Sequence, residues 1–253
     1  MMKLKINKEF LLNQVKNNDC IEIIDDSFGI INTFRNIDSK NKEQMIEFLK
    51  TKKFAYNNIT SNIQIHSAVV RKIDKNNIGT MQEADALVSN LKDVPLLIFT
   101  ADCLPIIFLD EENKAIGNAH AGWKGTYGLI SIKTLELMKK SYGTKFEDVK
   151  VYIGPAIGKC CYEVKEDLVY KFTAMLKKNN IKEEKISNIY EIRNEKIYLN
   201  LNIINIYLLE SIGVKRDNIF NYDLCTSCLN DTFYSYRVDD KTDKRIGSIV
   251  QIF

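Results

Sequence analysis

The sequence predicts an α/β fold, formed by a single domain with mixed β-sheet or sheets flanked by helices. Short apolar runs alternate with amphipathic helical segments in the middle of the chain, and paired strand-like runs flank that region. This alternation is typical of α/β domains. Pro occurs only three times in 253 residues, and we find no internal repeat or flexible linker in the sequence. We therefore expect one continuous domain over residues 1–253.

The spacing of apolar residues predicts the individual elements. Helices are expected where apolar residues recur every three to four positions, as at Leu129, Ile132, Leu135 and Met138. The expected helices span 42–53, 126–142, 165–178 and 200–212. A pair of strands is expected within 20–34, and one short strand in the segment KVYIGP. Further strands are expected at 63–73, 85–89, 95–100, 105–109, 114–119, 219–223, 232–238 and 246–252.

Composition and charge exclude several classes of protein. The net charge of +3 arises from 36 basic and 33 acidic residues that are well mixed, so nucleic acid is not an expected partner. No apolar run approaches the roughly 18 to 20 residues that span a bilayer. The first residues, MMKLKINKEF, lack the pattern of a secretion signal. We expect a cytoplasmic protein with no membrane partner, and cysteines that are reduced, buried or metal-binding.

Two rare histidines and one cysteine are the strongest candidate functional residues. His66 and His120 are the only histidines, and each lies at the end of a strand-like apolar run, as does Cys103. Two imidazoles and a thiolate suit zinc, and three ligands leave a position open for water or substrate, as in catalytic sites. Because 37 and 17 residues separate the three, spacing alone leaves open that they are unrelated.

Cys103 and its neighbour Asp102 are the residues expected to be catalytic. Cys103 could instead be a nucleophile with His120 as its base, or an inert buried thiol. Asp102 lies between apolar runs, where a carboxylate is rarely accommodated without a partner. It could orient a ligating imidazole, act as a general acid–base, or cap backbone amides at a turn.

Several motifs together resemble a known family. They are QIHSAVV, TADCLP, GNAHAGWKG, YIGPAIGKCCYEV and FYSYRVD, in this order from about Ile63 to the C-terminus. They resemble the multicopper polyphenol oxidase, or laccase-like, family, whose members are known as zinc-dependent purine nucleoside phosphorylases that also deaminate adenosine. The resemblance places the family's metal ligands on His66, Cys103 and His120. One departure is the Asn-, Asp- and Lys-rich stretch RNIDSKNKEQ, which stands where the family usually has a Gly- and Ser-rich segment.

Three cations are candidate binding residues for a phosphate or a phosphorylated substrate. Lys124 lies between Gly122 and Gly125, beside a predicted helix start that offers free N–H groups. The planar guanidinium of Arg237 suits phosphate or carboxylate, although a surface ion pair is a competing interpretation. Arg35 loosely matches the family's N-terminal arginine. Trp123, the only tryptophan, could stack on a purine, but core packing is the favoured interpretation.

Four further cysteines allow a second site. Cys160 and Cys161 are adjacent, and Cys225 and Cys228 have zinc-knuckle spacing. They could form a four-thiolate structural site. The two pairs are far apart in sequence and the resemblance does not require such a site, so ordinary reduced cysteines are favoured and one zinc per chain is expected.

The resemblance implies a zinc enzyme that uses phosphate to cleave adenosine, inosine and methylthioadenosine, and that deaminates adenosine at the same site. A copper-dependent polyphenol oxidase is the alternative that the older family name suggests. Coupled multicopper oxidation needs roughly ten histidine ligands, and this chain has two histidines. A zinc-stabilised binding module is a third hypothesis, which the open coordination position disfavours.

Overall fold

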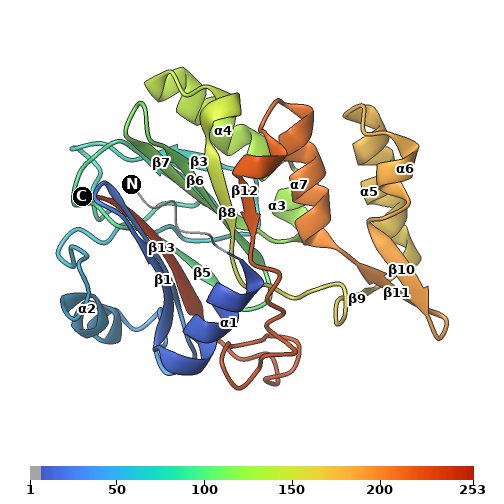
Figure 1. The fold of residues 1–253 in the computed structure, drawn as a ribbon, viewed down its shortest axis with the longest axis horizontal. Helices are drawn as coiled ribbons and strands as arrows, with labels where there is room; N and C mark the ends of the chain where they lie inside the picture. The colour runs from blue at the N-terminus through green and yellow to red at the C-terminus, as the bar shows by residue number, and fades with distance from the viewer. Residues whose placement is uncertain (1–6) are drawn as a thin grey trace.

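Two large sheets lie face to face in the computed structural model, which describes residues 7–253 (Figure 1). One sheet has four strands, in the order β1 (Cys20–Ile24), β2 (Phe28–Thr33), β13 (Ile246–Ile252) and β5 (Leu96–Thr100). The other has six strands, in the order β12 (Ile219–Asn221), β8 (Lys150–Ile153), β6 (Leu104–Asp110), β7 (Ala115–Ala121), β4 (Ala86–Ser89) and β3 (Val70–Lys72). A small third sheet has the order β10 (Tyr190–Arg193), β11 (Lys196–Leu199) and β9 (Glu163–Val164).

Helices flank the sheets (Figure 1). They are α1 (Lys8–Asn17), α2 (Lys42–Lys50), α3 (Trp123–Tyr127), α4 (Ile130–Tyr142), α5 (Glu166–Lys178), α6 (Glu183–Ile186) and α7 (Leu201–Ser211). Within the six-stranded sheet, β12 runs parallel to β8 and β3 runs parallel to β4, while the other pairs are antiparallel. The predicted α/β class with mixed sheets and flanking helices is therefore confirmed.

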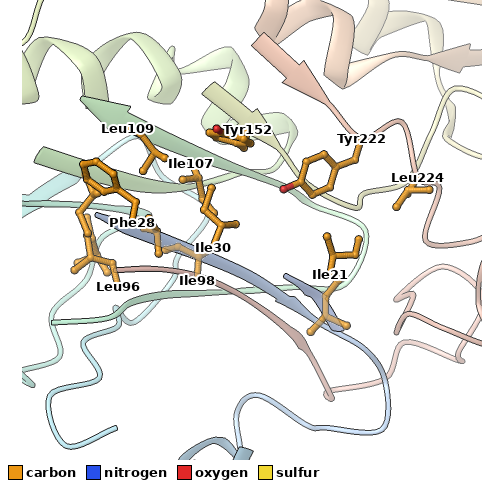
Figure 2. Close-up of a cluster of buried hydrophobic side chains, with 14 of the residues drawn as sticks. Ile21, Phe28, Ile30, Leu96, Ile98, Ile107, Leu109, Tyr152, Tyr222 and Leu224 are labelled. Carbon is orange, nitrogen blue, oxygen red and sulfur yellow. The ribbon is translucent and has the colours of Figure 1, made fainter. Parts of the chain in front are cut away.

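The alternation of side chains along β6 explains how one strand serves two cores. Ile107 and Leu109 point toward the four-stranded sheet, where they meet Ile30, Leu96 and Ile98 (Figure 2). The intervening residues of β6 (Leu104, Ile106 and Phe108) point the other way and pack against α4 and α7. Because both faces of β6 are covered, its sequence is a nearly continuous apolar run. Each such buried side chain contributes about 1.5–3 kcal/mol to folding.

Two smaller cores complete the fold. Met45, Phe48 and Leu49 of α2 cover the outer face of the four-stranded sheet. On the other side of the molecule, α5, α6, α7 and the small sheet share a core that includes Phe172 and Leu208. The β10–β11 hairpin, β9, α1 and α6 were not among the elements predicted from the apolar spacing.

Three predicted elements differ from the structure, and each difference lies near the candidate site. Only Val70–Lys72 of the expected strand 63–73 is a strand, because the residues before it bind a buried carboxylate. The segment 232–238 forms turns and no strand. The helix expected at 126–142 is divided into α3 and α4, because Leu129 adopts a left-handed conformation (φ 64°).

Among residues 7–253, no helix has the length and apolar character that crossing a membrane requires.

Candidate metal centre

The three predicted metal ligands converge at one point in the fold. His66 precedes β3, Cys103 lies where the chain passes from β5 of one sheet to β6 of the other, and His120 is near the end of β7. Their ligand atoms all lie within 4.8 Å of one another. His66 Nε2 is 3.9 Å from Cys103 Sγ, and the two imidazole rings meet edge to face with centroids 4.8 Å apart.

A buried carboxylate, Asp85, holds two of these ligands in place. Asp85 has no exposed surface, and its Oδ1 lies 2.9 Å from Nδ1 of His120. The same Oδ1 accepts the backbone N–H of His66 at 3.0 Å. Oδ2 accepts the backbone N–H and the hydroxyl of Ser67 at 2.6 and 2.7 Å. These bonds stabilise the left-handed backbone of His66 (φ 58°), which few non-glycine residues adopt.

The charges of the centre favour the form of Cys103 that binds metals. Burial alone raises the pKa of the Cys103 thiol, but hydrogen bonding and charge from His120, then from His66, outweigh it and lower the pKa to about 6. Burial likewise opposes the charged form of His120, yet Asp85 and Cys103 raise its pKa to about 9. For Asp85, burial is outweighed by the hydrogen bonds from His120 and Ser67, which lower the pKa to about 2. The thiolate of Cys103 is the metal-binding form.

The donor set fits a zinc ion. Because Nδ1 of His120 is bonded to Asp85, Nε2 is the nitrogen left to face a metal, and a carboxylate behind a ligating imidazole is a common feature of zinc centres. Gly122 provides the room that Cys103 needs, since a Cβ atom there would lie 2.9 Å from Cys103 Sγ. Two nitrogens and one sulfur are donors that zinc accepts, and they leave one coordination position free.

A cavity of about 730 Å³ opens onto the three ligands. This volume lies within the range of roughly 300–1,000 Å³ that is usual for small-molecule sites. Aromatic side chains line it, among them Phe99, Trp123, Tyr162 and Tyr236. Trp123 is half-buried: it packs against the core shared by α5 and α7, as favoured from the sequence, and it also lines this cavity. Within residues 7–253, the cations on the wall are Lys40, Arg237 and Arg245.

Asp102 also lines the cavity, but its carboxylate does not bind an imidazole. Oδ1 accepts the hydroxyl of Thr226 at 2.6 Å, and Oδ2 accepts the backbone N–H of Arg237 at 2.7 Å. Asp85, rather than Asp102, makes the hydrogen bond to His120. Asp85 was not among the predicted site residues. Like Asp102, it is a lone carboxylate among apolar neighbours, between two buried alanines at a strand start, and such a group needs partners.

The three candidate cations occupy different positions. Arg237 is exposed at the cavity wall, where its guanidinium lies 5.7 Å from the Tyr162 ring. Lys124 is exposed on α3 next to Trp123 and is not part of the cavity wall. Arg35 is also outside the cavity; its guanidinium bonds to the carbonyl of Asn230 and lies 3.5 Å from Asp239 Oδ1. Of the three, the structure brings only Arg237 to the candidate site.

The sequence also matches a known protein family. Residues 34–252 match the family model described as multi-copper polyphenol oxidoreductase laccase. The chain belongs to this family.

Curated relatives in the family carry the name purine nucleoside phosphorylase. The protein of that name from Borreliella burgdorferi is 37% identical over 174 residues, covering 69% of this chain and 71% of the relative. One from Aquifex aeolicus is 32% identical over 192 residues, covering 76% and 82%. The crystal structure of the hypothetical protein YfiH from Bacillus licheniformis aligns with a TM-score of 0.81 at 23% identity, covering 89% and 93%. That last likeness concerns the fold alone.

Proposed function

We propose that the chain is a zinc-dependent purine nucleoside phosphorylase that acts on adenosine, inosine and methylthioadenosine and also deaminates adenosine. The observation that carries the proposal is the convergence of His66, Cys103 and His120 on the wall of an aromatic cavity. The names of the relatives from Borreliella burgdorferi and Aquifex aeolicus support the substrate class.

His66, Cys103 and His120 would hold the zinc ion, with Asp85 behind His120 and the His66 loop. Zinc bound there supplies a Lewis acid that activates water or polarises an oxygen of the substrate. The protein contributes the orientation of the three ligands, which Asp85 fixes before any substrate arrives.

The cavity wall supplies the other groups that the reaction needs. Trp123 and Tyr162 offer flat aromatic faces that suit a purine ring. Asp102 is our candidate for the proton transfer to or from the purine, since it lines the cavity and its carboxylate is held by Thr226 and the Arg237 backbone. Arg237 is our candidate phosphate ligand, because a guanidinium binds phosphate oxygens in pairs.

Copper-dependent phenol oxidation, which the family's description suggests, is disfavoured by the donor set. A multicopper enzyme distributes many imidazoles over several copper centres. This chain has two histidines, and both belong to the one centre.

Phosphate-dependent turnover is the first test of the proposal. Purified protein should contain zinc and should release purine base from adenosine and inosine only when phosphate is added. It should also form inosine from adenosine without phosphate. Copper at several equivalents with zinc absent, or oxidation of a phenol with no nucleoside turnover, would contradict the proposal.

The phosphate site is tested by comparing Arg237→Ala with Lys124→Ala. Losing a charge-assisted contact costs about 1.5–3 kcal/mol, or roughly 10- to 150-fold in the phosphorolysis rate at low phosphate. We expect this loss for Arg237→Ala, with a much smaller effect on deamination, which uses no phosphate. Lys124→Ala is the matched control, because Lys124 lies outside the cavity. If Lys124→Ala loses more of the phosphate-dependent rate than Arg237→Ala does, the phosphate binds at the start of α3 instead.

A further inference from the structure

Four cysteines form a second cluster of metal-binding side chains. The sulfur atoms of Cys160, Cys161, Cys225 and Cys228 all lie within 4.8 Å of one another. The remaining two cysteines are Cys103, in the centre described above, and Cys20, which is buried between the four-stranded sheet and α2.

The topology of the six-stranded sheet explains why two distant pairs meet. Strands β8 and β12 are parallel neighbours, so their carboxyl ends lie at the same edge (Figure 1). Cys160 and Cys161 follow β8, and Cys225 and Cys228 follow β12. The pairing continues past both strands, because Ala156 donates to Leu224 at 3.1 Å and Thr226 donates to Ala156 at 3.0 Å. The two cysteine segments are therefore held side by side by the backbone.

The distances fit four ligands around one ion better than a disulfide. Zinc–sulfur bonds of about 2.3 Å in a tetrahedron place the sulfurs about 3.8 Å apart. Cys228 Sγ lies 3.4 Å from the sulfur of Cys160 and also 3.4 Å from that of Cys161. A disulfide would require about 2.05 Å between one chosen pair. Here Cys228 is equally close to two partners, so no pair is singled out.

The local backbone also has features of a thiolate site. The N–H of Gly158 donates to Cys225 Sγ at 3.3 Å, an interaction that stabilises negative charge on the sulfur. Gly158 is tightly enclosed by the cluster, because a Cβ atom there would lie 3.2 Å from Cys160 Sγ and 3.3 Å from Cys225 Cβ. Cys225 and Cys228 have the two-residue spacing of a zinc knuckle, and the Leu229 N–H donates to the Cys225 carbonyl at 2.9 Å.

We propose that Cys160, Cys161, Cys225 and Cys228 bind a structural zinc ion through four thiolates. With the three-ligand centre, the protein then holds two zinc ions per chain rather than the one expected from the sequence. Four protein ligands leave no open position, so this second ion takes no part in chemistry.

The second ion supports one wall of the cavity. Ile157 and Tyr162, on either side of the adjacent cysteines, both line the cavity, and the Ile157 N–H donates to the Asp102 carbonyl at 2.9 Å. Thr226, between the other two cysteines, donates to the Asp102 carboxylate. Fixing the two cysteine segments therefore fixes the contacts that position Asp102.

Metal content of single variants tests the proposal without reference to activity. Protein purified under reducing conditions should contain about two zinc ions per chain by elemental analysis. Cys228→Ser should contain about one, as should Cys103→Ala, and the double variant should contain close to none. Cys20→Ser replaces a cysteine that belongs to neither site, so this variant should keep both ions. If wild-type protein contains one ion and Cys228→Ser also contains one, the four cysteines are ordinary thiols and the proposal fails.

Cobalt spectroscopy covers the case in which Cys228→Ser does not fold. Cys103→Ala, stripped of metal and reloaded with cobalt, should show the intense thiolate-to-cobalt charge transfer of a four-sulfur tetrahedral site. The proposal would be overturned if that band is absent or if the purified protein contains iron in place of zinc. A mass lower by two hydrogens under non-reducing conditions, which indicates a disulfide, would also overturn it. If the four cysteines bind zinc but the protein does not turn over nucleosides, this inference is supported and only the proposed function is contradicted.

Discussion

At the scale of single residues, Asp85 connects the parts of the candidate metal centre through hydrogen bonds. One carboxylate bonds to His120, to the backbone of His66 and to Ser67. It therefore sets both the ring orientation of one ligand and the backbone position of another. Asp102 is adjacent to Cys103 in sequence, but its hydrogen bonds join the cavity wall to Thr226 and Arg237.

Asp85→Asn should weaken zinc binding about 10- to 100-fold, which is the usual effect of losing a carboxylate behind a metal ligand. The amide keeps the size of the side chain, but its NH2 group cannot accept the hydrogen bonds that one carboxylate oxygen now receives. Competition with a chromophoric chelator measures the change in affinity.

Asp110→Asn is the matched control for this measurement. Asp110 is also buried and accepts the Asn113 backbone and side-chain N–H groups at the end of β6, away from the metal ligands. It should lose stability without losing metal affinity. Equal loss of affinity in the two variants would show that Asp85 acts only through general stability.

The three candidate metal ligands could be selected from the sequence because histidine is so rare in this chain. His66, Cys103 and His120 stand at the ends of apolar runs, and the fold brings those ends together. The positions of Lys124 and Arg35 were not predictable, since the direction of an exposed cation depends on tertiary contacts. The four-cysteine cluster depends on β8 and β12 being neighbours, and strand order is not encoded in the local sequence.

At the scale of elements, the strands of the two sheets were predictable and the segments around the site were not. Strands such as β5, β6 and β13 are apolar runs whose burial decides their conformation. The segments 63–69 and 232–238 contain similar β-favouring residues, yet several of their N–H groups bond to the carboxylates of Asp85, Asp102 and Asp239. Carboxylates thus replace a neighbouring strand as the hydrogen-bond acceptors.

Arg35→Ala should loosen the segment 229–239, which carries Arg237 and lacks a strand partner. The Arg35 guanidinium contacts the Asn230 carbonyl and Asp239 and lies 5.1 Å from the Tyr234 ring. Because it is partly exposed, we expect a loss of only about 1–2 kcal/mol of unfolding free energy. Hydrogen exchange should become faster within 229–239.

Arg216→Ala provides the comparison, since Arg216 makes a half-exposed ion pair with Glu210 at 3.7 Å. It should leave exchange in 229–239 unchanged. Unchanged exchange in Arg35→Ala as well would mean that Phe233, buried against Phe34, is sufficient to hold the segment.

At the scale of the whole molecule, the two proposed ions join parts of the chain that are distant in sequence. The three-ligand centre links the segment before β3, which carries His66, to Cys103 between β5 and β6 and to His120 on β7. In the four-cysteine cluster, Cys228 is separated in sequence by 68 positions from Cys160 and by 67 from Cys161. The sequence between the two cysteine pairs includes α5, α6, α7 and the small sheet. Since neither site exists in the unfolded chain, each metal's binding free energy adds to the stability of the folded state.

Chelation should therefore lower the thermal unfolding midpoint of the wild type more than that of either single-site variant. A ligand that binds only the folded state stabilises it according to its concentration and affinity, and two sites contribute two such terms. Each kcal/mol corresponds to roughly 2–4 °C for a chain of this size. Scanning calorimetry should show the largest chelator-induced shift for wild type, a smaller one for Cys103→Ala and for Cys228→Ser, and none for the double variant. A shift of wild-type size in Cys228→Ser would mean that the four cysteines hold no ion, and a shift that persists in the double variant would mean that the chelator acts elsewhere on the protein.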